Sequence, residues 1–195
     1  MRFLERRAGT GQGKYLIFFA VGAAAGFFAL NIGKSILLEG TGLFDEYTLY
    51  QMKYMTVDSS ALFCYVFRRR ILWVLGVALA ATTYLGPAAC VGSTLWYGMS
   101  AGVFLASLTL QYGVKGIILA FLCVFPQYLL YVPAALALFA WCEGLFRGIR
   151  IQEGDRNTVL RKAGQLAGVC LVVTAGCLLE GYLNPYLLLG YLKIF

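Results

Sequence analysis

The sequence predicts an all-α fold, a polytopic transmembrane helical bundle with five or six membrane segments. Of the 195 residues, 61% are hydrophobic before the 23 glycines are counted, whereas soluble domains have roughly 45–50% with glycine included. Charged residues make up only 13%, and the mean hydropathy is +0.76. Such a chain cannot cover a water-soluble globule with polar side chains. We therefore expect a single integral membrane domain over residues 1–195, multi-pass in the cell membrane.

Uncharged stretches locate the first three segments, because a helix needs about 20 predominantly apolar residues to cross the bilayer. The first stretch is Tyr15–Gly33. The next, Ile71–Val114, is long enough for two segments. Glycine and proline near its middle mark a break. We therefore expect a second segment at Ile71–Gly86 and a third at Ala89–Tyr112.

The remaining segments leave the number of crossings open. The apolar stretch Gly116–Phe146 is interrupted by Pro126 and Pro133. It crosses either twice or once, and in the second case it is a broken or partly re-entrant element. The last segment, Ala163–Leu183, ends shortly before Pro185. The two alternatives for the broken element give six or five membrane segments.

A polar connection, residues 34–70, separates the first two segments. Its stretch Tyr47–Phe67 mixes aromatic residues with few charges and contains neither glycine nor proline. This pattern predicts an interfacial amphipathic helix that leads into the second segment. The connection ends in the triplet Arg68, Arg69 and Arg70.

The basic residues predict the orientation of the chain. Nine of the 16 lie either before Tyr15 or in the segment Arg147–Lys162. If the broken element crosses once, the positive-inside rule places both regions and the N-terminus in the cytoplasm. The triplet Arg68–Arg70 then lies outside, against the rule. We interpret the formal charge of +7 as an orientation signal, and we expect no nucleic-acid partner.

Several enzyme classes are excluded because the chain has no histidine. Ser-His-Asp and Cys-His catalysis and His-ligated metal sites all require one. The six cysteines form no Cys-x-x-Cys pair, so we expect packing residues rather than metal ligands or disulfides. Ser100 and Ser107, with Lys115 nearby, give only a weak Ser-Lys pattern. We expect no enzymatic activity, no catalytic residue, no metal and no cofactor.

Pairs of glycines spaced four residues apart indicate how the helices pack. Glycines at this spacing lie on one helix face and let another helix approach closely in lipid. Packing within the chain is the expected role of each pair, and a seam between copies in a homo-oligomer is the open alternative. The pairs are Gly22 and Gly26, Gly98 and Gly102, Gly144 and Gly148, and Gly164 and Gly168.

Polar residues inside apolar segments are candidate functional residues, because a charge at a helix centre costs roughly 2.5–3.5 kcal/mol on insertion scales. Glu143 lies four residues before Arg147, which predicts an ion pair. Glu180 has no such neighbour, so a packed polar contact and a substrate path are both open. Pro126 leaves a carbonyl unpaired that the amide of Gln127 can satisfy. Such breaks are also where transporters place their sites.

Two runs of sequence carry a resemblance to a known family. They are KGIILAFLCVFPQYLLYVPA and, about 50 residues later, LLEGYLNPYLL. Together with the basic N-terminus, the early single segment and the long polar connection, they resemble the stage II sporulation protein M family. The family signature falls on Lys115, Gly116, Pro126, Gln127, Pro133, Glu180 and Pro185.

The resemblance implies a function in endospore-forming Firmicutes, the engulfment of the forespore by the mother cell. It implies a membrane scaffold that anchors and localises two peptidoglycan-degrading partners, the stage II sporulation proteins D and P. The open alternative is a transporter or permease subunit, which rests on Glu180 and on the break at Pro126 and Gln127. Because the chain has no nucleotide-binding motif, such a subunit would work with a separate ATPase.

Overall fold

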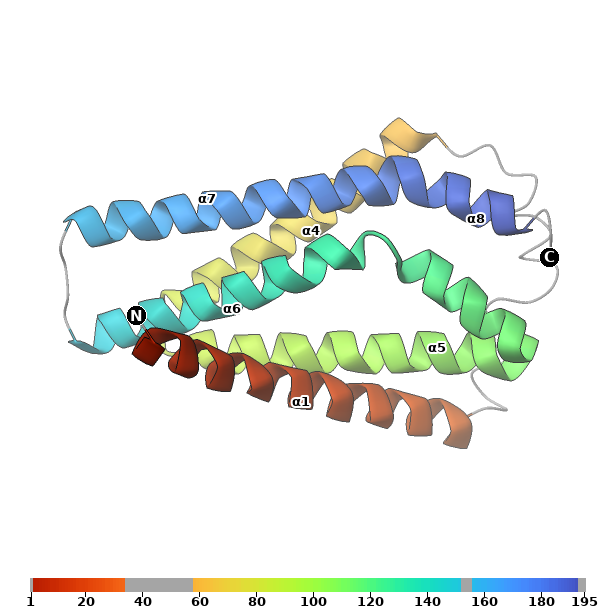
Figure 1. Ribbon diagram of the computed structural model, residues 1–195, viewed down its shortest axis with the longest axis horizontal. Coiled ribbons are helices and arrows are strands. Elements are labelled where there is room, and N and C mark those ends of the chain that lie inside the picture. Colours follow the sequence, from red (N-terminus) through yellow and green to blue (C-terminus); the bar gives the residue numbers. More distant parts are fainter. Residues whose placement is uncertain (1, 34–57, 152–155, 193–195) are drawn as a thin grey trace.

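The computed structural model describes residues 2–33, 58–151 and 156–192, and within them every regular element is a helix (Figure 1). The expected all-α fold is confirmed for this part of the chain. The elements are α1 (Arg2–Ile32), α4 (Ser59–Ala81), α5 (Gly86–Val124), α6 (Tyr128–Ile151), α7 (Arg156–Leu178), a π-helix (Leu179–Leu183) and α8 (Asn184–Leu192).

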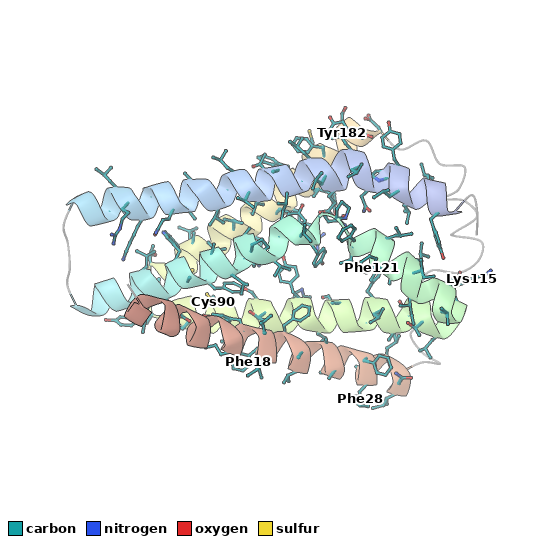
Figure 2. The ribbon with its side chains drawn as sticks, viewed as in Figure 1. Phe18, Phe28, Cys90, Lys115, Phe121 and Tyr182 are labelled. Carbon is teal, nitrogen blue, oxygen red and sulfur yellow. The ribbon has the colours of Figure 1, made fainter. Side chains whose placement is uncertain are left out.

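The long helices lie side by side along the long axis of the molecule (Figure 1). One end of the molecule contains the N-terminus of α1, the start of α5, the end of α6 and the start of α7. The end of α1, Lys115 and α8 lie at the other (Figure 2). The two regions that hold nine of the 16 basic residues therefore lie at the same end of the bundle.

Four stretches of helix in the described part of the chain are long and apolar enough to cross a membrane. They are Gly13–Ile32, Gly86–Val124, Tyr128–Phe146 and Val159–Tyr191. Large apolar side chains such as Ile17, Trp96 and Leu171 point outward on them, each at least 65% exposed. An apolar outer surface of this kind is expected in lipid and not in water. These helices indicate a multi-pass membrane protein.

Helix α4 differs from the helix that the sequence predicts. The expected second segment begins at Ile71, whereas α4 begins at Ser59 and continues through the three arginines to Ala81. The Asp58 side chain caps it by accepting hydrogen bonds from the backbone N–H groups of Ser60, at 2.9 Å, and Ala61, at 3.3 Å. The start of the expected interfacial helix and the rest of the polar connection, residues 34–57, lie outside the described residues.

The other predicted breaks coincide with ends of helices. α5 begins at Gly86 with a proline in its first turn, where the missing N–H of proline costs nothing. Gly113 has a φ of 58° and interrupts α5 just after the predicted end of the third segment at Tyr112. This left-handed conformation favours glycine. Beyond it the chain folds back, and a Cβ on Gly116 would collide with the carbonyl oxygen of Leu108.

Helix α1 packs closely on α5 through two of the predicted glycine pairs. A Cβ added to Gly22 would lie 2.5 Å from the carbonyl oxygen of Leu95, and one added to Gly102 would collide with that of Ala23. Gly26 and Gly98 make equally close approaches across the same interface. Packing within the chain is therefore confirmed for these two pairs. No atom outside the local helix lies within 4 Å of a Cβ built on Gly144, Gly164 or Gly168.

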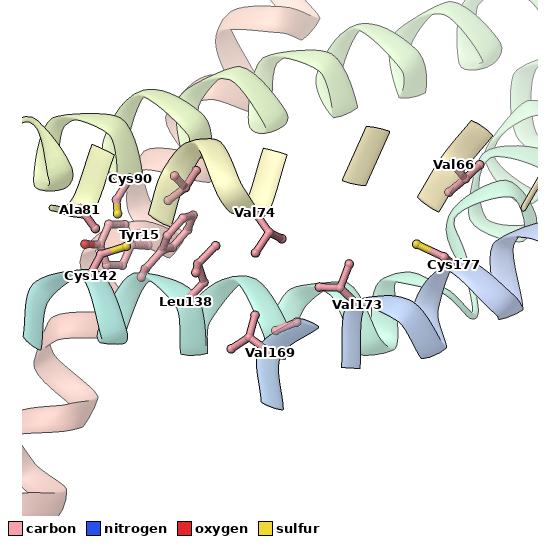
Figure 3. Close-up of a cluster of buried hydrophobic side chains, with 13 residues drawn as sticks. Tyr15, Val66, Val74, Ala81, Cys90, Leu138, Cys142, Val169, Val173 and Cys177 are labelled. Carbon is pink, nitrogen blue, oxygen red and sulfur yellow. The ribbon is translucent and has the colours of Figure 1, made fainter. Parts of the chain in front are cut away.

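The main core lies between α4, α6 and α7, with α5 and the start of α1 at one end (Figure 3). Val74 and Leu138 are fully buried there. The cysteines behave mostly as expected: Cys90, Cys142 and Cys177 are buried in this core, and all six are free thiols. A smaller core of Leu108, Leu119 and Ala120 packs against α8 at the other end.

Candidate functional site

The predicted break lies between α5 and α6 and is held together by side-chain amides. The Phe125–Pro126 peptide is cis, and Gln127, only 3% exposed, donates a hydrogen bond from Nε2 to the carbonyl of Cys123. Asn184 Nδ2 approaches the same carbonyl oxygen at 3.3 Å. The sequence therefore predicted correctly that Gln127 satisfies a carbonyl at the break. The contribution of Asn184 comes from 61 residues further along the chain.

The two remaining prolines of the signature lie in the first half of one helix and at the start of another. Pro133 is inside α6, and Pro185 is the second residue of α8, directly after the π-helix. Proline has no N–H to donate to the carbonyl four residues earlier. A π-helix, with hydrogen bonds to the fifth residue back, can accommodate this gap in the backbone hydrogen bonds. The backbone N–H of Asn184 accordingly bonds the carbonyl of Leu179, five residues back.

Glu180 lies in the π-helix and joins three helices. Its Oε2 accepts a hydrogen bond from Tyr131 Oη at 2.7 Å and forms an ion pair with Arg70 Nη2 at 3.4 Å. The Arg70 guanidinium also stacks over the Tyr131 ring, 4.6 Å from its centroid. We call these three residues the Glu180 cluster. The side chains of Arg70 and Glu180 are only 24% and 21% exposed, so the cluster is a packed polar contact between α4, α6 and the π-helix.

A second ion pair involves Glu143 at the opposite end of α6. The sequence predicts Arg147 as its partner, but the Arg147 side chain lies outside the described ones. In the structure Glu143 Oε1 accepts a hydrogen bond from Tyr15 Oη at 2.6 Å and pairs with Lys14 Nζ at 2.5 Å. These contacts tie the middle of α1 to α6. Tyr15 is 3% exposed and packs against the ring of Phe139.

The seven signature residues come together in two groups. Lys115 and Gly116 lie at the turn after Gly113, where Tyr191 Oη of α8 approaches the carbonyl of Lys115 at 3.5 Å. Pro126 and Gln127 lie at the break, where Asn184, the neighbour of Pro185, approaches the carbonyl of Cys123. Glu180 binds Tyr131, two residues before Pro133. The two sequence runs that carry the resemblance therefore contact each other at the break and at the Glu180 cluster.

Metal ligands and the two serines of the Ser-Lys pattern are the remaining candidate reactive groups. Among the described residues, no group of three or more Cys, Asp or Glu could hold a metal ion. The hydroxyls of Ser100 and Ser107 donate to carbonyls of their own helix, those of Trp96 and Phe104, both at 2.9 Å. A serine engaged in this way is the usual arrangement of serine inside a helix.

A cavity of about 200 Å³ lies between the two ion pairs. Tyr15 lines it toward the Glu143 contact, and Arg70 and Tyr131 line it toward the Glu180 cluster. The rest of its wall is formed mainly by apolar and aromatic side chains of α1, α4, α5, α6 and α7. No signature residue lines it, so this cavity is a feature that sequence reasoning missed.

Comparisons with protein-family models, with curated proteins and with solved structures find no match for this chain. A functional proposal therefore starts from the sequence resemblance and from the geometry of the break, the Glu180 cluster and the cavity. The residues of the two runs build the break and supply Tyr131 and Glu180 of the cluster, and Arg70 comes from α4.

Proposed function

We propose that this chain is the membrane scaffold of a sporulation engulfment complex, anchoring and localising peptidoglycan-degrading partners in the cell membrane. The observation that carries the proposal is that both runs of the resemblance meet in space. Cys123 and Tyr131 of the first run bind Asn184 and Glu180 of the second. A resemblance spread over two distant runs is more informative when the runs form one structural unit.

The chemistry of that unit supports a structural role. Its polar contacts connect helices: Tyr131 on α6 and Arg70 on α4 both reach Glu180 on the π-helix. Buried hydrogen-bonded networks of this kind hold helices in one arrangement. A fixed bundle is suited to anchoring partner proteins, and we infer that the partners are the stage II sporulation proteins D and P of the family that the sequence resembles.

The helix arrangement favours five crossings over six. In this proposal five segments each cross once: α1, α4, α5 as far as Tyr112, the broken element 114–146, and α7 with α8. The N-terminus is cytoplasmic. α4 crosses although it contains three arginines, because Arg70 is paired with Glu180 and arginine side chains can reach toward the interface. The basic N-terminal and 147–162 regions then lie on one side, as the positive-inside rule requires.

Cysteine labelling tests this topology. In a variant without native cysteines, single cysteines at Gln12 and Arg150 should react with a membrane-impermeant maleimide from the cytoplasmic side. A cysteine at Lys193 should react from the outer side, because one crossing separates it from Arg150. The comparison uses intact cells and inverted vesicles. Labelling of Arg150→Cys and Lys193→Cys from the same side would show an even number of crossings between them and would refute the five-segment arrangement.

The part of the polar connection before α4, residues 34–57, is the proposed partner surface, because in this topology it is the longest connection between two crossings on the outer side. Scrambling residues 40–57 should abolish co-purification of the two hydrolases from sporulating cells while leaving the chain in the membrane fraction. The scrambled region stops before the Asp58 cap, so α4 keeps its N-terminal hydrogen bonds. A matched control scrambles residues 152–155, a connection at the opposite end. Unchanged recruitment after scrambling residues 40–57 would rule out this surface.

A transporter or permease subunit that works with a separate ATPase is the second candidate. It is favoured by one observation, a helix break at Pro126 beside a cavity with Arg70 on its wall. Transporters commonly place substrate sites at broken helices near the middle of the bilayer. The two candidates differ in whether the charge of Glu180 is needed for function.

A further inference from the structure

The cavity is lined along half of α6. Along this helix it extends from Tyr128 to Phe139, which at a rise of 1.5 Å per residue is about 16 Å. Its inner wall is formed by Trp73 on α4 and Tyr97 on α5, whose rings are in edge contact with centroids 5.3 Å apart. A cavity of this length can hold an extended hydrocarbon chain.

The cavity lies next to the outer surface of the bundle between α1 and α6. Leu16 on α1 and Val132 on α6 both line it and are 58% and 46% exposed. α1 packs mainly on α5 and makes few contacts with α6, and Figure 1 shows the two helices diverging from the N-terminal end. Because this surface belongs to membrane-spanning helices, the medium at the opening is the hydrocarbon of the bilayer.

Three of the hydroxyl groups around the cavity are bound to protein groups. Tyr131 Oη donates to Glu180, Tyr15 Oη to Glu143, and Thr94 Oγ1 to the carbonyl of Cys90 at 2.7 Å. An apolar cavity of about 150 Å³ stays free of water and takes up apolar molecules. The cavity of about 200 Å³ therefore favours an apolar occupant over water or a polar substrate.

Charge distinguishes the two ends of the cavity. At one end, Tyr15 lies beside Lys14, whose side chain is 48% exposed although it pairs with Glu143. The basic N-terminal region and the 147–162 region lie at this same end. Basic groups at a membrane surface attract anionic lipid headgroups. At the other end Arg70 is paired with Glu180.

We propose that the chain binds one anionic phospholipid, with an acyl chain in this cavity and the phosphate near Lys14. The acyl chain enters from the bilayer between α1 and α6, past Leu16 and Val132. It packs on Trp73 and Tyr97, and it replaces the missing packing between α1 and α6. The site is independent of the proposed scaffold function, because none of the partner proteins contributes to it.

Photolabelling in vesicles tests the site. The full chain is reconstituted with phosphatidylglycerol that carries a photoreactive diazirine on its acyl chain, illuminated and digested, and the adducts are located by mass spectrometry. We expect adducts at Trp73 or Tyr97, in addition to adducts at outward-facing residues such as Leu171. Adducts confined to outward-facing residues would refute the proposal without the need for any variant.

Two variants and a second probe complete the test. Val132→Trp fills the opening and should reduce the adducts at Tyr97 at least about fivefold, because the added ring takes the volume of the acyl chain. Leu171→Trp, at a 72% exposed position on α7 outside the cavity, should leave them unchanged. Phosphatidylethanolamine with the same diazirine chain should label Tyr97 about fivefold less, as expected for the loss of one headgroup charge. Equal labelling by both lipids, or by Val132→Trp and the native chain, would overturn the proposal.

Discussion

Gly102→Ala is expected to lower the free energy of unfolding by about 2 kcal/mol, the middle of the range for an overpacked site. The added Cβ would collide with the carbonyl oxygen of Ala23, with the rest of that peptide unit close behind. Backbone atoms cannot move aside as a flexible side chain can, so α1 must separate from α5. Thermal unfolding in detergent measures the effect, and about 2 kcal/mol corresponds to a decrease in Tm of roughly 4–8 °C for a chain of this size.

Gly92→Ala is the matched control on the same helix. No atom outside the local helix lies within 4 Å of a Cβ added to Gly92, so the variant keeps the packing and gains helix propensity, up to about 1 kcal/mol. The two alanine variants should therefore shift Tm in opposite directions. A Gly102→Ala protein as stable as the native chain would show that α1 does not pack on α5 through these glycines.

The helices and the glycine interface could be predicted because both depend on local pattern. Long uncharged stretches define where helices form in lipid, and glycines four residues apart lie on one face whatever the partner helix is. The turn after Tyr112 and the break at Pro126 were predictable for the same reason. A positive φ at Gly113 and a missing N–H at Pro126 are properties of single residue types.

The ion pairs could not be predicted because their partners are distant in the sequence. Glu180 and Arg70 are 110 residues apart. Glu143 pairs with Lys14, the neighbour of Tyr15, which is itself 128 residues from Glu143. Local spacing placed Arg70 in an outer connection, and the Arg147 side chain that it predicted as a partner of Glu143 lies outside the described ones. One signal was present: Arg70 and Glu180 are opposite charges next to apolar segments, each costly without a partner. Pairing such charges with each other would have predicted the Glu180 cluster and the longer helix α4.

Asn184 illustrates a second limit. Its side chain approaches the carbonyl of Cys123, which already accepts a hydrogen bond from Gln127. In the sequence, Asn184 followed by Pro185 indicates only a helix end. In the structure the helix instead continues through the π-helix into α8. The Asn184 side chain therefore does not cap a helix, and it contacts the break between α5 and α6. The local sequence therefore predicts a helix end at Asn184, but it cannot predict the contact of this side chain with the carbonyl of Cys123.

Glu180→Gln is expected to destabilise the protein more than any other single change at the proposed site, by about 3–5 kcal/mol, the cost of an uncompensated buried charge. The amide can still accept the hydrogen bond of Tyr131, but it leaves the guanidinium of Arg70 without its counter-ion in a largely buried place. The control is Arg69→Met, because Arg69 is exposed and its hydrogen bond within the described part of the chain goes to the hydroxyl of Tyr65, at 3.1 Å. Thermal unfolding of Arg69→Met should match that of the native protein.

The double variant Arg70→Met with Glu180→Gln separates the two candidate functions. Removing both charges avoids the unpaired arginine, so we expect it to recover at least half of the stability lost in Glu180→Gln, since replacing a buried pair by apolar groups is often neutral. A scaffold needs the shape of the bundle, so this variant should still co-purify the two hydrolases and support engulfment. A transport cycle that uses the Glu180 carboxylate would fail in the double variant even though the protein folds. Normal stability with lost function would therefore refute the scaffold and leave the permease as the function of this chain.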